Sequence, residues 1–244
     1  MLLLFALMDA PIFVKVVILF LITLVVFTVG IAFERFAILS FQEKSSKDFD
    51  KEFNSGEMLD VIFNKLSNKT KIHAPLARIF FVGMKELTQS NIRSIDFSEM
   101  YAEDVKRNIR VRMLSMTSIE QSQIALEMKG SISFLVAVAV IAPLIGLLGT
   151  LYGLMHNIHD FSTPVSYDAV SGIYSSLASF VISLAVSVVA IMTYNILVAK
   201  INHYTMEHDL FGIKVSNILS RELDFITTNA YQRKAIEMKQ KPQQ

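Results

Sequence analysis

The chain contains no cysteine among its 244 residues. This absence excludes a disulfide framework, a catalytic thiolate and a metal site built on cysteine ligands. The formal net charge is only +1, so the charge balance gives no indication of nucleic-acid binding. The sequence also lacks a GxxxxGK[ST] phosphate loop, an HExxH zinc motif and a serine in a nucleophile-elbow context. The five histidines provide two close pairs without a third ligand nearby. We therefore predict no enzymatic activity, no cofactor and no metal site.

Charged residues are missing from three long windows of a chain that is 52% hydrophobic. The windows cover residues 16–33, 130–157 and 169–199. As helices, they are long enough to cross a hydrocarbon core of about 30 Å. They predict transmembrane helices at residues 14–36, 131–155 and 170–198. Buried helices of a soluble core are the alternative, but such helices rarely run this long without a charge.

Lysine and arginine are distributed unevenly around these predicted spans. Residues 37–130 hold 14 of the 23, the tail at residues 199–244 holds seven, and the hairpin at residues 156–169 holds none. Because cytoplasmic loops carry an excess of these residues, the first two segments are predicted to be cytoplasmic. The N-terminal segment 1–13 and the hairpin are then periplasmic. The first span lacks a basic flank and a prompt cleavage site, so we expect it to remain as an anchor.

The cytoplasmic segments are predicted to be helical. No glycine or proline occurs between Met84 and Lys129, and the residue pattern predicts a long helix that runs directly into the second span. After Lys200, five residues share roughly one helix face: Tyr204, Phe211, Val215, Ile218 and Leu219. They predict that the third span continues as a cytoplasmic helix. The expected fold class is all-α, with three transmembrane helices and long helices extending into a cytoplasmic bundle.

Small residues gather in the second span, which ends in APLIGLLGTLYGLM. Gly146, Gly149 and Gly153 fall at spacings of three and four, which opens one helix face to a close-packed neighbour. Pro143 removes a backbone donor and predicts a kink. Thr150 lies near the glycine face, where its hydroxyl can bond a carbonyl of its own helix. The pattern predicts tight helix packing at this face.

The third span carries serine at every fourth position. The members of this serine repeat are Ser171, Ser175, Ser179, Ser183 and Ser187, and Ser176 accompanies them. Successive members are displaced by about 40°, so the repeat winds around the helix. Small hydroxyl-bearing residues suit both tight packing and the wall of a wet pore. Apart from His156 at the edge, tyrosine is the only ionisable residue type in spans two and three, so a proton path there needs an acid from a partner.

These two stretches resemble the TolQ/ExbB/MotA proton-channel family. The residues that match its first motif block are Pro143, Gly146, Leu147, Gly149, Thr150, Gly153 and Met155. Those that match its second block and its closing motif are Gly172, Ile173, Leu177, Ala178, Leu184, Tyr194 and Asn195. The resemblance covers about residues 10–220. Within the family, the TolQ branch is most similar, on the loop stretches FNSGEMLDVIFNKL and RIFFVGMKELTQ, and the ExbB branch is its nearest neighbour.

The resemblance implies a homopentamer in a bacterial inner membrane, with spans two and three around a central pore. TolR/ExbD-like single-span partners would each bring a membrane aspartate, and proton flow there would move a TolA/TonB-like protein. The implied function is a motor that supports outer-membrane integrity and cell division. Thr150 is then the polar pore residue of span two, and Ser175 and Ser179 keep span three polar. Ser183 and Ser187 are assigned to packing with the glycines. The alternatives are a subunit that energises TonB-dependent uptake and a non-conducting membrane scaffold.

The chain departs from the family pattern at two polar positions. Ser175 stands where the family has glutamate, and Phe180 stands where it has a second threonine. Three explanations are open. The serines replace the lost groups and hold water, the register is shifted by one residue, or the chain assembles without conducting protons.

Overall fold

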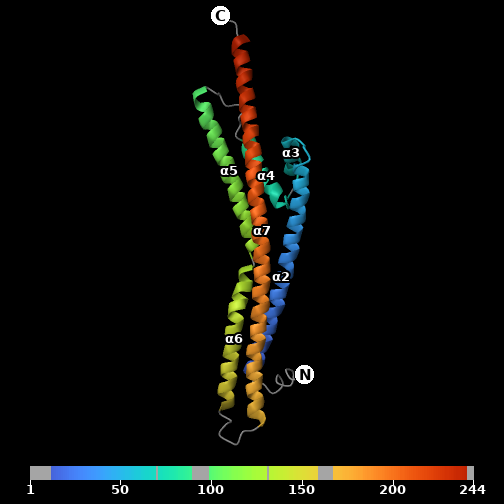
Figure 1. The fold of residues 1–244 in the computed structure, drawn as a ribbon, viewed down its shortest axis with the longest axis vertical. Helices are drawn as coiled ribbons and strands as arrows, with labels where there is room; N and C mark the ends of the chain where they lie inside the picture. Colours follow the sequence, from blue (N-terminus) through green and yellow to red (C-terminus); the bar gives the residue numbers. More distant parts are fainter. Residues whose placement is uncertain (1–11, 70, 90–98, 131, 159–166, 241–244) are drawn as a thin grey trace. The chain divides into compact units, whose positions relative to one another are not determined.

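The computed structural model describes residues 12–69, 71–89, 99–130, 132–158 and 167–240, and the elements in these ranges are all helices (Figure 1). In chain order they are α2 (Ile12–Phe53), α3 (Leu59–Ser67), α4 (Pro75–Gln89), α5 (Glu99–Lys129), α6 (Ile132–Ile158) and α7 (Tyr167–Gln240). The predicted all-α fold class is confirmed for the part of the chain that is described.

Three helical runs of the described residues are long and apolar enough to cross a bilayer. They are Ile12–Phe53, Glu103–His156 and Gly172–Asn229. Large apolar side chains such as Leu148 and Val181 are more than half exposed on these helices, as suits contact with lipid. The chain is an all-α membrane protein with three membrane-spanning helices.

The structure adds detail at the ends of the predicted spans. α2 continues to Phe53, and α7 is one helix of 74 residues, so the predicted continuation of the third span is confirmed. α5 ends at Lys129 and α6 begins at Ile132, and Ser131 lies outside the described residues, so the expected run from the polar helix directly into the second span stays a prediction. Gly130, which follows α5, lies in a turn. Because glycine inside a helix costs about 1 kcal/mol relative to alanine, a helix ends readily at this position.

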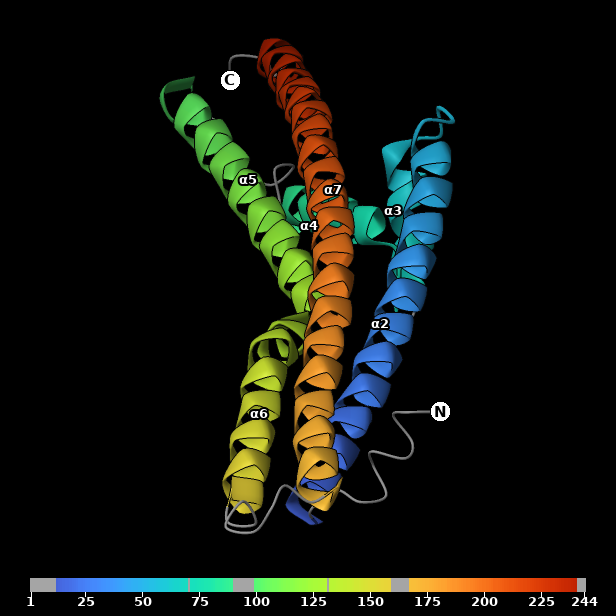
Figure 2. The ribbon, with the colours of Figure 1, turned by 60° about the horizontal axis from the view of Figure 1, so that its bottom comes forward.

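The chain divides into two compact units. The membrane unit comprises the chain up to Ile38 together with Lys129–Lys200, and the second unit comprises Leu39–Met128 and the chain from Ile201. In the membrane unit, α6 and the first part of α7 lie beside the first part of α2 (Figure 2). Their shared core consists of Val17, Leu21, Val138, Ala139, Ala142, Val186 and Ala190. The alanines allow the helices to approach closely.

The core of the second unit is centred on four phenylalanines. Phe49 and Phe53 of α2 lie against Phe80 of α4 and Phe211 of α7, with ring centroids 5.2–6.2 Å apart across these pairs. α3 packs against α4. The predicted apolar face of α7 is largely confirmed, because four of its members are buried: Tyr204, Phe211, Val215 and Leu219. Ile218 is only half-buried.

Candidate functional site between α6 and α7

A row of glycines on α6 faces a row of serines on α7 in the membrane unit. We call this contact the glycine–serine seam and define it by Gly146, Gly149, Gly153, Ser176, Ser179 and Ser183. A Cβ atom built on Gly146 would lie 1.8 Å from Ser183 Oγ, and one on Gly153 would lie 1.9 Å from Ser176 Oγ. The helices therefore touch where glycine leaves room for a serine side chain. Because α6 and α7 are antiparallel, a position later on α6 meets one earlier on α7.

Gly149 occupies the middle of the seam and also faces α2. A Cβ atom there would lie 3.2 Å from Ser179 Oγ and 3.1 Å from Val17 Cγ1. These distances are tight but much longer than those at the two outer glycines. The three helices of the membrane unit therefore meet at Gly149, and they also meet at Gly153, where a Cβ atom would lie 3.4 Å from Val14 Cγ2 of α2.

The serine hydroxyls of the seam bond their own helix. Ser176 Oγ donates to Gly172 O at 2.7 Å, and Ser179 Oγ donates to Ser176 O at 2.7 Å. Ser183 Oγ likewise donates to Phe180 O at 2.7 Å. Each hydroxyl hydrogen is therefore committed to a carbonyl, and the oxygen lone pairs are the hydrogen-bonding capacity that is left.

Thr150 and Ser175 lie in the same buried region. Thr150 Oγ1 donates to Leu147 O at 2.7 Å, and Gly146 O lies 3.3 Å away. Ser175 Oγ donates to Gly172 O at 2.9 Å. The exposed fractions of Thr150 and Ser175 are 5% and 2%, so both side chains are buried within this chain.

Ser187 makes a different contact from the other serines. Its Oγ donates to Ala139 O of α6 at 2.6 Å, so it joins the two helices directly. Pro143 lies inside α6, and the kink expected there stays a prediction. The side chain of Ser171 lies outside the described part of the structure.

The structure brings most of the predicted site residues together. All three glycines, Thr150 and four serines lie along the α6–α7 contact or beside it, and Ser176 is the seam residue that the predicted site omitted. A sequence signal for Ser176 existed. It precedes Ser183 by the same seven residues that separate Gly146 from Gly153, as an antiparallel glycine–serine contact requires.

The seam has no charged residue of its own. Residues 132–155 and 172–199, which form these parts of α6 and α7, contain no Asp, Glu, Lys, Arg or His. Hydroxyl oxygens are therefore its main polar side-chain atoms. Such oxygens can accept hydrogen bonds from water or from a partner, but they do not hold or release a proton near neutral pH.

Comparison with known proteins identifies the family. A model of the MotA/TolQ/ExbB proton channel family matches residues 71–209, more than half of the chain. The chain belongs to this family. The region that matches the MotA/TolQ/ExbB family includes every residue of the seam, so the predicted family resemblance is confirmed.

Two curated relatives within the MotA/TolQ/ExbB family are similar to nearly the whole chain. The Tol-Pal system protein TolQ of Haemophilus influenzae is 29% identical over 218 residues, which cover 88% of this chain and 92% of that protein. The Tol-Pal system protein TolQ of Pseudomonas aeruginosa is 24% identical over 218 residues, covering 88% of this chain and 91% of that protein.

Proposed function

We propose that the chain is a TolQ-like subunit of an inner-membrane proton-channel motor of the Tol-Pal type. The observation that carries this proposal is the family match, which spans both helices of the glycine–serine seam. Both relatives described above are Tol-Pal system proteins, which favours this assignment over TonB-dependent uptake. In this role the subunit uses the proton-motive force to energise a TolA-like protein, supporting outer-membrane integrity and cell division.

The proposal divides the proton path between this chain and a partner. Spans two and three offer hydroxyls but no carboxylate, and a carboxylate is the group whose pKa an apolar site can raise toward neutral pH. A TolR-like single-span protein supplies it as a membrane aspartate. Thr150, Ser175 and Ser179 supply oxygens along the path to that aspartate. The subunit assembles as a homopentamer around the partner, with its N-terminus periplasmic and its C-terminus cytoplasmic.

The hydrogen bonds of the seam favour a second candidate, a non-conducting membrane scaffold. Every seam serine donates to a carbonyl of its own helix, and two of them fill the space left by a glycine. Packing alone accounts for these contacts. The two candidates differ in whether the hydroxyl oxygens are needed after the helices have assembled.

Variants that remove a hydroxyl and leave the carbon atoms of the side chain in place separate the two candidates. Thr150→Val retains the shape of threonine, and Ser179→Ala retains the Cβ atom at the seam. Ser183→Ala is the matched control, because its hydroxyl makes the same kind of bond and is assigned to packing alone. Under the channel proposal, the first two variants assemble normally but fail to restore detergent resistance to cells that lack their own TolQ-like subunit. The control restores it.

Full resistance with both Thr150→Val and Ser179→Ala would reject the polar path and leave the scaffold. The partner is tested separately by isolating the complex in mild detergent. Recovery of a short single-span protein with a membrane aspartate supports the proposal. An intact assembly that contains no such protein contradicts it.

A further inference from the structure

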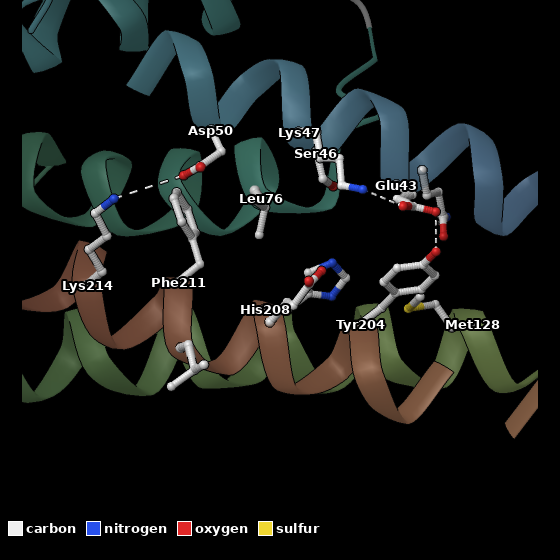
Figure 3. A pocket seen from close by; sticks show the side chains of 13 residues that line it. Glu43, Ser46, Lys47, Asp50, Leu76, Met128, Tyr204, His208, Phe211 and Lys214 are labelled. Atoms are coloured by element: carbon white, nitrogen blue, oxygen red, sulfur yellow. Dashed lines mark hydrogen bonds and ion pairs between the residues drawn. The ribbon is translucent and has the colours of Figure 1, made fainter. Parts of the chain in front are cut away.

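A cavity of about 420 Å³ lies within the second unit, and no residue of the seam is among those that line it (Figure 3). Its walls are formed mainly by α2 and α7, with Leu76 from α4 and Met128 from α5. Ligand sites in proteins commonly have volumes of about 300–1,000 Å³. The cavity is therefore large enough for a small molecule, and the proton path proposed above makes no use of it.

Two polar atoms of α2 are buried at this cavity without a partner. Ser46 is only 8% exposed, and neither its Oγ nor the Oε1 of Gln42 has a hydrogen-bond partner among the described residues. Gln42 and Ser46 are four residues apart, so they lie on the same face of α2. A buried polar atom without a hydrogen bond costs about 1–3 kcal/mol, and a ligand that donates hydrogen bonds removes this cost.

The opposite wall presents His208 of α7, whose side chain extends toward α2 (Figure 3). It is 5% exposed, and burial lowers its pKa to about 4, so the imidazole is neutral at pH 7. Tyr204 donates its hydroxyl hydrogen to Glu43, and burial raises the pKa of this tyrosine well above its ordinary value. Neither residue brings a positive charge to the cavity.

The charges that line the cavity favour a cation over an anion. The acidic and basic side chains of the lining are Glu43, Asp50, Glu207, Lys47 and Lys214, so carboxyl groups outnumber amino groups. Both lysines also have carboxylate neighbours: Lys47 Nζ lies 2.6 Å from Glu43 Oε1, and Lys214 Nζ lies 4.0 Å from Asp50 Oδ1. An anion would be repelled by the excess carboxylate and by the buried oxygens of α2. An ammonium group, in contrast, would find hydrogen-bond acceptors in both.

We infer that this cavity binds a small organic cation, a primary amine on a short aliphatic chain. The ammonium group donates to Gln42 Oε1 and Ser46 Oγ and is attracted by the carboxylate of Glu43. The aliphatic chain lies against apolar lining residues such as Leu76 and Met128. This inference does not depend on the channel proposal, because none of these residues belongs to the proposed proton path.

Titration calorimetry on the purified protein in detergent tests the inference with butan-1-amine as the probe. We expect saturable one-to-one binding that weakens at least about tenfold in Ser46→Ala and in Gln42→Leu, since each loses a hydrogen bond to a charged group. Ser122→Ala is the matched control, because this exposed serine of α5 bonds only its own helix and lies outside the cavity. Its affinity stays unchanged.

Two further probes show which binding results would contradict the inference. Butan-1-ol has the same length and no charge, and inorganic phosphate is an anion. Equal binding of the alcohol or preferred binding of phosphate would overturn the inference. So would amine binding that Ser46→Ala and Gln42→Leu leave intact, or the absence of saturable binding, which would mean that water alone fills the cavity.

Discussion

Adding one methyl group at Gly146 is the most direct test of the glycine–serine seam. The Cβ atom of an alanine there would lie 2.3 Å from Ser183 Cβ and 1.8 Å from its Oγ. Carbon atoms in favourable contact are about 3.5–4.0 Å apart, so the overlap exceeds about 1 Å and a helix must move. Overpacking costs typically about 1–3 kcal/mol. We expect Gly146→Ala to lie near the top of that range.

The residue across the seam shows whether the loss is steric. Ser183→Ala removes Oγ but leaves Cβ in place, so it should recover little of the stability lost in Gly146→Ala. Ser183→Gly removes both atoms and should recover most of it. Gly149→Ala should cost less, because its nearest neighbour is 3.1 Å away. Gly30→Ala is the control on α2, since no atom lies within 4 Å of the added carbon.

Unfolding of the purified variants in mixed detergent micelles, followed by circular dichroism at increasing denaturant, supplies the measurement. The expected order of stability is Gly30→Ala, then Gly149→Ala, then Gly146→Ala. Equal midpoints for Gly146→Ala and Gly30→Ala would refute the close contact. Rescue by Ser183→Ala as complete as that by Ser183→Gly would show that the side-chain oxygen alone causes the clash.

Three further predictions concern the second unit. Gly212→Ala would place a Cβ atom 2.2 Å from Gln121 Nε2 and disturb the hydrogen bond that this nitrogen donates to a backbone carbonyl. We expect the free energy of unfolding to fall by about 1 kcal/mol, and most of this loss to disappear in a Gln121→Ala background. A double-mutant cycle of unfolding midpoints measures both effects. The pKa of His208 is lowered from 6.5 to about 4, so between these pH values the unfolded chain binds more protons than the folded chain. The free energy of unfolding should therefore fall as the pH drops from about 6.5 toward 4. Denaturation at pH 7 and at pH 5 should show a smaller difference in stability for His208→Gln than for the wild type. Arg78→Lys loses the two-pronged contact with Glu127, at 2.7 and 3.1 Å, and should lower the free energy of unfolding by about 1 kcal/mol; an unchanged midpoint would contradict this.

The three spans could be predicted from the sequence because a bilayer imposes a simple rule. Crossing it requires about 20 apolar residues without charge, and the three windows satisfy this requirement. The small residues of the seam were also visible, since glycine at spacings of three and four is typical of close helix contact. The family resemblance followed from these same residues.

The pairing of residues across the seam could not be predicted from one helix at a time. The predicted site lacks Ser176 because a serine repeat in steps of four does not include it, whereas the contact follows the seven-residue offset shared with α6. The cavity of the second unit was missed for a related reason. Ser46 and His208 are separated by most of the chain, and their meeting depends on how α2 and α7 pack.

The two units are interleaved along the chain, and this has a consequence for biosynthesis. The membrane unit is complete only at Lys200, and the second unit needs residues that follow it. At about 5–20 residues per second, roughly 2–6 s pass between synthesis of Gly153 and of Ser183. About 8–30 s pass between synthesis of Phe53 and of Phe211. The nascent chain therefore holds unpaired faces of both units at once, and a stop codon just after Lys200 would spare the membrane unit and abolish the other.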